Sequence, residues 1–401
     1  MQTTVQLIEP MPIALKPAVK IMLNIGHAID HMFLLIFATA VTSIAREFGF
    51  ANWTDLMPYS VGAFALFGLG ALPAGRLGDL WGRRPMMIIF FIGMGLAALL
   101  TALSQNAWQL AACLTLMGAF AAIYHPVGIP MLVQNVPNPG AVIGLNGLAG
   151  NLGIACAALL TGLLIESLGW RAAFAFPGIV SITCGIYFAF CCPKESHAPA
   201  KGKGSRAQVA LSPAALVRVF IVMTIAAATT SLLFNFTTNG NLPFLTQGFE
   251  GLIEDPARLG LMLAAIYTVA SFAQLIVGKW IDQFSMKKLQ MILSWLQIPL
   301  LIMVVYTKHW SLFWALLGVM VFVFGTIPFT DAMIVRYVDD SLRSRVAGMR
   351  LTVAFGISSV AVWLLGPVVK SLGFGMLFWM MAGIATVKAL VVMWLPDEPK
   401  S

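Results

Sequence analysis

The decisive stretch of the sequence is residues 75–85, which read GRLGDLWGRRP. It is a charged segment between two long apolar runs, in a chain where only 10% of residues are charged. Gly75 and Gly82 permit a tight backbone reversal at low steric cost. The aspartate and the arginines have to stay at a water-facing surface, because each would cost about 2.5–3.5 kcal/mol at the centre of a membrane. We therefore expect a loop that joins two membrane spans.

The second half of the chain repeats this segment. Residues 278–282 (GKWID) stand 203 positions after residues 75–79 (GRLGD) and keep the glycine, a basic residue and the aspartate. Further on, residues 348–350 (GMR) align with residues 144–146 (GLN) at an offset of 204. A constant offset of about half the chain length indicates a tandem duplication.

The composition is that of an integral membrane protein. Of 401 residues, 59% are hydrophobic, and the mean hydropathy is +0.88, whereas soluble domains carry about 25% charged residues. The net charge of +8 is spread over loops and does not indicate a nucleic-acid partner. The sequence has no GxxxxGK[ST] pattern for binding a nucleotide. We expect a lipid bilayer as the surroundings, with no nucleic acid, no cofactor and no enzymatic activity.

Apolar runs of about 20 residues, each long enough to cross roughly 30 Å of hydrocarbon, recur along the whole chain. They predict an all-α membrane protein with about twelve transmembrane helices. The predicted spans are residues 22–45, 57–75, 85–104, 108–134, 142–168, 172–192, 216–246, 260–279, 289–306, 311–336, 346–370 and 374–394.

Positive charge is divided unevenly between the two sides of this map. Eighteen of the 24 lysines and arginines lie on one side and five on the other, while Lys388 falls within the last span. The positive-inside rule then places both termini in the cytoplasm and the protein in the cytoplasmic (inner) membrane. Residues 193–214, with Pro, Gly, Ser and Lys, are predicted to be a flexible cytoplasmic linker. The linker would join an N-terminal half, 1–192, to a C-terminal half, 215–401.

With this duplication and hydropathy, residues 75–84 resemble the signature loop of the major facilitator superfamily, whose pattern is G-x-x-x-D-x-x-G-R-[RK]. Leu80 departs from the family, where a basic residue usually follows the aspartate. The resemblance implies two pseudo-symmetric six-helix halves, transport by alternating access, and a monomer. In that family the loop is a conformational latch, whose aspartate meets the N-terminus of helix eleven. The resemblance assigns the latch to Gly75, Asp79, Gly82, Arg83, Arg84 and, in the repeat, Asp282.

Two short histidine-bearing runs resemble the fosmidomycin-resistance type of efflux protein within this superfamily. They are residues 26–31 (GHAIDH) and residues 124–128 (YHPVG). Two family features are missing: Leu114 stands where proton-driven members have an arginine, and Ala157-Ala158 stand near the place of the Gly-Pro antiporter motif. The direction of transport therefore stays open, with efflux favoured.

Ionisable residues inside spans are costly and are functional candidates by default. In the first span, His27, Asp30 and His31 share one helix face, since Asp30 projects about 60° and His31 about 40° from the direction of His27. In the fourth span, Tyr124 and His125 precede a proline that frees a backbone carbonyl. The first and fourth helices line the central cavity in the superfamily. These five residues are therefore predicted to bind substrate or to carry protons as the coupling ion, or else to form a structural polar network.

The same side chains support a second interpretation, a metal site. His27 and His31 have i, i+4 spacing, and Asp30 and His125 would complete a set of nitrogen and oxygen ligands suited to a divalent ion. Two histidines one turn apart are a weak signal by themselves.

The second half supplies neutral and charged candidates. The seventh span looks broken by Gly240 and Pro243, and residues 240–258 are predicted to be the longest outside loop. Arg350, at the start of the eleventh span, is placed either at the cavity, facing an anionic substrate group or Asp331, or at the membrane flank. The second-half candidates are Asn235, Asn239, Tyr267, Gln274, Asp331 and Arg350.

Three functions follow from these observations. The first is a secondary active transporter for a small organic solute, coupled to protons. The second is a transporter of a metal ion or of a metal chelate such as a siderophore, centred on the intramembrane histidines and aspartate. The third is a membrane receptor that kept the fold and lost transport.

Overall fold

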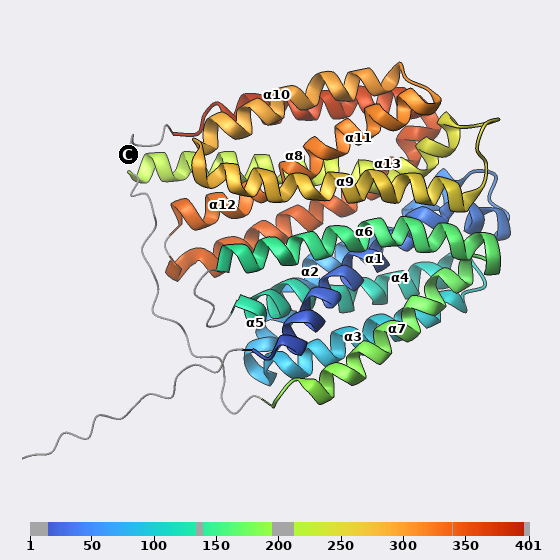
Figure 1. Ribbon diagram of the computed structural model, residues 1–401, viewed down its shortest axis with the longest axis horizontal. Coiled ribbons are helices and arrows are strands. Elements are labelled where there is room, and N and C mark those ends of the chain that lie inside the picture. The colour runs from blue at the N-terminus through green and yellow to red at the C-terminus, as the bar shows by residue number, and fades with distance from the viewer. Residues whose placement is uncertain (1–14, 134–138, 195–211, 339, 397–401) are drawn as a thin grey trace, which may run out of the picture.

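The computed structural model describes residues 15–133, 139–194, 212–338 and 340–396, and in these residues all regular structure is helical. The long helices run side by side as one bundle (Figure 1). The first-half elements are α1 (Pro17–Glu47), η1 (Trp53–Asp55), η2 (Met57–Ser60), α2 (Val61–Trp81), α3 (Arg83–Ala102), α4 (Ala107–Ala121), η3 (Tyr124–Gly128), α5 (Ile129–Val133), α6 (Pro139–Leu168) and α7 (Trp170–Cys191). The second-half elements are α8 (Pro213–Gly248), α9 (Pro256–Gln283), α10 (Met286–Val305), α11 (His309–Gly325), α12 (Pro328–Tyr337) and α13 (Asp340–Val392).

Eleven helical runs among the described residues are long and apolar enough to span a membrane. The last run, Met349–Val392, has 44 residues, or about 66 Å of helix, twice the thickness of a hydrocarbon core. It is divided at Gly373, whose φ of 76° is not helical. The two last predicted spans meet at this glycine, so the prediction of about twelve spans in two six-helix halves is confirmed.

The duplication is visible in the backbone. Gly169, between α6 and α7, has φ 83° and ψ 167°, and Gly373, 204 residues later, has φ 76° and ψ 169°. Gly49, after α1, and Gly251, after α8, share a φ of 76° at an offset of 202. Positive φ favours glycine because it has no Cβ. These four turns lie at one end of the bundle, called here the far end; the opposite end, where α1 begins, is the terminal end (Figure 1).

Two loop predictions are wrong. Residues 75–81 continue α2, and only Gly82, with φ 94°, breaks the helix. Gly75 is helical because of packing: a Cβ there would lie 3.3 Å from Pro126 Cβ. Likewise, α8 runs unbroken past Gly240 and Pro243 to Gly248, and the loop that follows ends where α9 begins at Pro256. Neighbouring helices allow proline inside a membrane helix.

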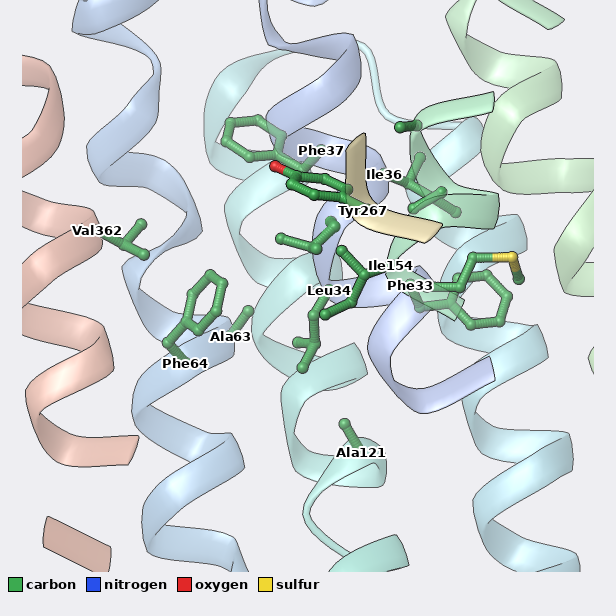
Figure 2. Close-up of a cluster of buried hydrophobic side chains, with 14 of the residues drawn as sticks. Phe33, Leu34, Ile36, Phe37, Ala63, Phe64, Ala121, Ile154, Tyr267 and Val362 are labelled. Carbon is green, nitrogen blue, oxygen red and sulfur yellow. The ribbon is translucent and has the colours of Figure 1, made fainter. Parts of the chain in front are cut away.

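Helix α1 lies at the centre of the core. Its Phe33, Ile36 and Phe37 are at most 2% exposed and belong to one buried cluster with Ile154 of α6 and Tyr267 of α9. Figure 2 shows the three α1 side chains among ribbons of the first half, with Tyr267 of the second half beside them. Gly153 lets α6 approach α1 closely, since a Cβ there would lie 2.1 Å from the carbonyl oxygen of Ala28. The first span is therefore fixed by close backbone packing, and its polar side chains cannot turn toward lipid.

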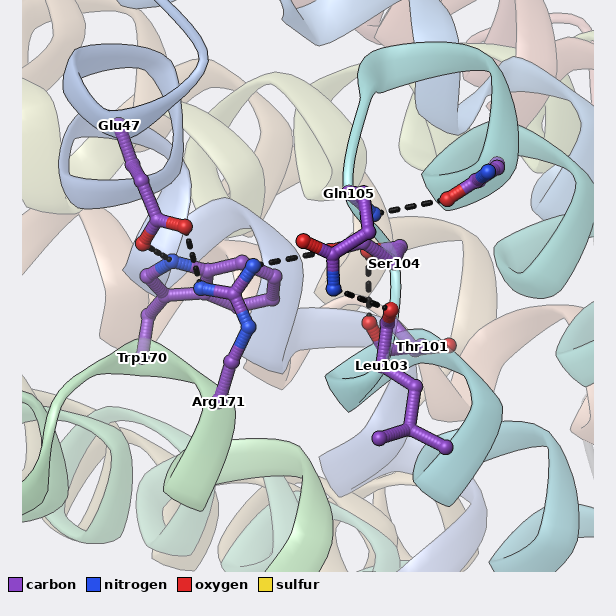
Figure 3. Close-up of polar contacts among 8 residues, drawn as sticks. Glu47, Thr101, Leu103, Ser104, Gln105, Trp170 and Arg171 are labelled. Carbon is purple, nitrogen blue, oxygen red and sulfur yellow. Dashed lines mark hydrogen bonds and ion pairs between the residues drawn. The ribbon is translucent and has the colours of Figure 1, made fainter.

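A polar network closes the first half at the far end (Figure 3). Glu47, at the end of α1, accepts a hydrogen bond from Trp170 Nε1 at 2.6 Å and forms an ion pair with Arg171. Arg171 Nη2 also donates to the carbonyl oxygen of Ser104 at 2.9 Å. These contacts join α1, α7 and the turn before α4.

Contacts between the two halves also lie at the far end. Lys370 Nζ of α13 is 2.5 Å from Asp55 Oδ1 of η1. Gly366 of α13 makes room for Thr54, since a Cβ on Gly366 would lie 2.2 Å from the carbonyl oxygen of Thr54. Gly162 of α6 likewise packs on α9 beside Gly260. The halves are therefore held together at the far end.

Candidate functional site

A cluster of three histidines and one aspartate lies inside the first half. Helix α1 supplies His27, Asp30 and His31, and their shared face is turned into the bundle, with Asp30 0% exposed. The fourth span supplies His125. The ring centroids of His27 and His125 are 5.1 Å apart, and those of His31 and His125 are 5.8 Å apart. The structure thus brings together the first-half candidates that the sequence identified.

A break in the fourth span delivers His125 to this cluster. Helix α4 ends at Ala121, and residues Tyr124–Gly128 form a single π-type turn before α5. Pro126, inside this turn, has no N–H for the helical ladder, so the backbone widens locally. Such wide turns are frequent at functional sites. Tyr124 then stacks on His27, with ring centroids 4.8 Å apart.

The hydrogen bonds of His27 define its tautomer. Its Nδ1 lies 2.6 Å from the carbonyl oxygen of Asn146. Because a carbonyl only accepts, Nδ1 carries the proton, and the neutral ring accepts at Nε2. His31 Nε2 lies 3.1 Å from this atom and therefore donates to it. The two α1 histidines form a directed hydrogen-bond chain that begins at α6.

Asn146 of α6 is the hub of the cluster. Its Nδ2 donates to Tyr124 Oη at 2.8 Å and to Asn24 Oδ1 at 3.0 Å, and Tyr124 Oη donates to the carbonyl of Leu23 at 2.7 Å. Sequence reasoning did not select Asn146 as a site residue. The sequence signal that could have identified it was a polar amide side chain inside an apolar span rich in small residues. Nearby Gly150 leaves space for the imidazole, since a Cβ there would lie 2.7 Å from His27 Cε1.

Asp30 has no hydrogen bond with any described residue. Both of its carboxylate oxygens are buried without a hydrogen-bond partner there, and so is His125 Nε2. Asp30 Oδ2 is 3.6 Å from His125 Nε2, which is too long for a hydrogen bond. A buried carboxylate without hydrogen bonds is costly, and this cost is removed when the carboxyl takes up a proton or meets a cation. The geometry therefore suits a carboxyl group that binds and releases a proton or a cation.

The histidines also approach the geometry of a metal site. One ring nitrogen from each of His27, His31 and His125 lies within 4.8 Å of the others. Bonds of about 2.0–2.1 Å to one tetrahedral zinc ion would place nitrogens roughly 3.3 Å apart. The His27–His31 distance of 3.1 Å fits this value. The imidazole of His125 would have to move closer to those of His27 and His31 to complete the set.

The amide candidates of the second half lie in a separate, hydrogen-bonded network. Asn235 Nδ2 donates to Ser358 Oγ at 2.8 Å, and Asn239 Nδ2 donates to the carbonyl of Asn235 at 3.0 Å. Tyr267 Oη lies 3.3 Å from Asn241 Nδ2. These side chains stabilise the packing of α8 against its neighbours and are not brought to the histidine cluster.

Gln274 of α9 lies against the first half. A Cβ on Gly147, next to Asn146, would lie 3.3 Å from Gln274 Oε1, so Gln274 faces α6.

Arg350 Nη2 is 2.6 Å from Asp331 Oδ1, and its Nη1 donates to Thr330 Oγ1 at 2.7 Å. Arg350 is 16% exposed and its Nε is buried without a hydrogen bond. The guanidinium is thus turned into the bundle rather than along its rim.

An aromatic contact joins the halves beside the cluster. Phe67 of α2 and Phe355 of α13 have ring centroids 4.0 Å apart, and His125 is 5.8 Å from the first ring and 5.7 Å from the second. Gly68 makes the contact possible, because a Cβ there would lie 2.7 Å from Phe355 Cβ. The two rings thus form a contact between the halves directly beside His125.

The predicted latch residues lie at the terminal end. Arg83 Nη1 donates to the carbonyl of Pro130 at 3.0 Å, while Arg84 donates to the carbonyls of Cys192 at 2.8 Å and Ala189 at 2.6 Å. Both arginines therefore brace helices within the first half. Asp79 is exposed and has no hydrogen bond or ion pair with any described residue. The side chain of Asp282 lies outside the described residues.

The fold and the buried titratable cluster define a polytopic helical membrane protein built from two related halves. Residues 23–324 match the family model of the Major Facilitator Superfamily, and the chain therefore belongs to that superfamily. It is a membrane transporter and not an enzyme.

Similar proteins agree with this assignment. The chain is 24% identical over 370 residues to the multidrug resistance protein MdtG of Yersinia enterocolitica, covering 87% of this chain and 86% of the relative. It is 24% identical to the uncharacterized MFS-type transporter YybF of Bacillus subtilis, covering 65% and 64%. Among solved structures, an inward-facing, occupied bacterial homolog of the human lysosomal transporter Spinster superposes with a TM-score of 0.71 at 14% identity, covering 95% of both chains. The likeness to the fosmidomycin-resistance type stays a prediction.

Proposed function

We propose that this protein is a secondary active transporter that exports a small organic solute by alternating access and is driven by protons that bind at Asp30. The observation that carries the proposal is the carboxyl of Asp30, which is fully buried, has no hydrogen bond, and lies 3.6 Å from His125 Nε2. A proton on Asp30 removes an uncompensated buried charge. Export is favoured by the similarity to multidrug resistance proteins.

The proposed cycle uses the two ends of the bundle differently. With both termini in the cytoplasm, as the positive-inside rule favours, the far end faces outward, and its inter-half contacts correspond to a closed outer side. Asp79 is exposed and unpaired among the described residues, as expected for a latch that engages α13 only when the terminal end closes. The segment 193–214 is proposed as the cytoplasmic linker that lets halves 1–192 and 215–401 move.

The test compares Asp30→Asn with wild-type protein in proteoliposomes, using ethidium and fosmidomycin as probe solutes. Asn mimics a permanently protonated side chain, so we expect accumulation driven by a pH gradient to fall about 100-fold while solute exchange stays within about twofold. The matched control is Asp255→Asn, the same chemical change at the N-cap of α9, where Asn caps equally well. Gradient-driven accumulation at the wild-type rate in Asp30→Asn would refute proton binding at this residue.

A second function, export of a divalent metal ion, is favoured by one observation, the three ring nitrogens within 4.8 Å. In this case the metal is the substrate and Asp30 is a ligand. Binding of Zn²⁺, Co²⁺ or Ni²⁺ should strengthen as the pH rises through the imidazole range, because protons compete for the nitrogens. Asp30→Asn should weaken metal affinity at every pH, and His125→Ala should weaken it further. Calorimetric titration at pH 6 and 7.5 separates this outcome from proton-coupled solute transport.

A further inference from the structure

A second buried polar cluster lies away from the histidines, between α10 and the second run of α13. Lys388 is 0% exposed, and its Nζ donates to Gln297 Oε1 at 2.7 Å. Among the described residues, no carboxylate forms an ion pair with Lys388. A buried ammonium without a counter-charge is strongly unfavourable. The cluster therefore lacks a negatively charged group that would balance the ammonium of Lys388.

Two more hydrogen-bond donors in this cluster have no partner. Gln297 Nε2 and Ser294 Oγ are buried and unbonded, and the two residues, three positions apart, are neighbours on one helix face. Ser294 is unusual in this respect. Other hydroxyls in the same half, on Ser271 and Thr386, donate to the carbonyl four residues earlier, at 2.6 Å and 2.8 Å.

The duplicated interface in the first half shows that the fold does not need this polarity. At an offset of 203, Gln290, Ser294 and Gln297 correspond to Met87, Phe91 and Met94, which are all 0% exposed. At an offset of 204, Lys388 corresponds to Cys184. The contact of α3 with α7 is mostly apolar, and the buried hydroxyl of Ser181 there donates to the carbonyl of Phe91 at 2.7 Å. Between α10 and α13, by contrast, a cation and donors without a hydrogen bond among the described residues take these places.

We propose that the interface between α10 and α13 binds a small monovalent anion, such as chloride, through Lys388, Gln297 and Ser294. An ammonium, an amide N–H and a hydroxyl are three donors for one acceptor, and a single cation matches a single negative charge. Because Gln297 Oε1 accepts from Lys388, the amide nitrogen of Gln297 is the atom left for the ligand. Gln290 Oε1, also without a partner, is two helical turns or about 10 Å from Gln297 along the axis and lies outside the site.

The test is the thermal unfolding of the purified full-length protein in sodium chloride, with sodium gluconate keeping the ionic strength constant. An anion that binds only the folded state raises its stability by mass action. We expect a saturable rise in Tm with chloride, and at least tenfold weaker apparent affinity in Lys388→Met and Ser294→Ala. Gln290→Leu, which removes a buried amide from the same helix face, is the matched control and should keep the wild-type response.

Two results would overturn the proposal. A wild-type Tm that does not depend on chloride would mean that Lys388 is accommodated as a neutral amine. An unchanged chloride response in Lys388→Met, or in Ser294→Ala should the lysine variant fail to fold, would place the anion elsewhere. Anomalous scattering from crystals grown in bromide gives an independent answer: a peak within hydrogen-bond distance of Lys388 Nζ supports the site, and a peak only at other positions contradicts it.

Discussion

At the centre of the bundle, the first half places three histidines around an aspartate that has no hydrogen bond among the described residues, whereas the second half places amides and a tyrosine in a hydrogen-bonded network. In the contacts of α3 with α7 and of α10 with α13 the contrast is reversed, because there the second half carries the buried charge. The contact between α3 and α7 contains Met87, Phe91 and Met94. In the second half, Lys388 of α13 donates to Gln297 of α10, and α10 carries two buried donors that have no hydrogen bond among the described residues. Duplication preserved the positions of the helices and their turns, and the buried charges diverged. Buried charge is therefore not required by the packing that the two halves share.

The equivalent residues Asn146 and Arg350 show how far the divergence goes. They align at an offset of 204, and each holds its helix to polar groups of another span. Asn146 binds α1 and the turn at Tyr124, and Arg350 binds Thr330 and Asp331 of α12. One architectural position is filled by a neutral amide in the half with the titratable cluster and by a cation in the half without it.

The prediction with the largest expected effect tests whether the two halves pack equally tightly, by replacing equivalent glycines with alanine. In the first half, a Cβ on Gly153 would lie 2.1 Å from the backbone oxygen of Ala28, whereas a Cβ on Gly356, at an offset of 203, would meet nothing within 4 Å. Gly153→Ala should cost about 3 kcal/mol or more, because neither backbone can move without displacing a helix. Gly356→Ala should be neutral or stabilise by roughly 0.5–1 kcal/mol. Thermal unfolding and the yield of monodisperse protein measure both, and equal stability of the two variants would contradict the asymmetry.

Much of this fold was predictable, for physical reasons that also explain the errors. Hydropathy predicted the spans, because a helix that crosses a membrane needs a run of about 20 apolar residues. The constant offset of 203 residues indicated the duplication. The errors fell on Gly75, Gly240 and Pro243, which in water-soluble proteins mark turns. Inside a membrane bundle, these residues serve close helix packing, and neighbouring helices maintain the backbone.

Within one helix, spacing predicted that His27, Asp30 and His31 share a face. His125 was joined to them by the family resemblance, which places the first and fourth helices at the central cavity. The π-type turn at Tyr124–Gly128 was not predicted. The contribution of Asn146 depends on partners more than a hundred positions away, such as the His27 ring 119 residues earlier. One sequence contains no signal for such pairings. Lys388 was visible as a charge in a span, but its unpaired neighbours on α10 were not.

The prediction with the next largest expected effect compares the loss of stability when each of two buried tyrosines, Tyr124 and Tyr267, is replaced by phenylalanine. Tyr124 Oη has two short hydrogen bonds, of 2.7 Å and 2.8 Å, whereas Tyr267 Oη has two long ones, of 3.4 Å and 3.3 Å. Tyr124→Phe should therefore destabilise the protein by about 1–2 kcal/mol, since it also leaves Asn146 with an unsatisfied N–H. Tyr267→Phe should cost about 0.5 kcal/mol or less. Chemical or thermal unfolding of the two variants side by side measures the difference; a larger loss in Tyr267→Phe would show that the second-half network is the tighter one.

The smallest expected effect concerns the ion pair that joins the halves. Asp55 and Lys370 are 34% and 52% exposed at a distance of 2.5 Å. An exposed pair of this kind contributes about 0–1 kcal/mol, and salt screens it. Asp55→Asn should therefore change Tm very little. The exchange of both charges, Asp55→Lys with Lys370→Asp, should restore whatever the single change removes.

The value of this pair lies in the equilibrium between conformations, where even 1 kcal/mol changes a population ratio about fivefold. Spin labels at Leu103 and Leu252, exposed on the far ends of the two halves, report the opening of that end in a variant without the five native cysteines. Asp55→Asn should increase the long-distance population, and the charge exchange should return it to the wild-type value. If Asp55→Asn leaves the distance distribution unchanged at low salt, the far end is held by the helix contacts at Gly162 and Gly366 alone. In that case the two halves are joined by packing, and the charges that distinguish them act only inside each half.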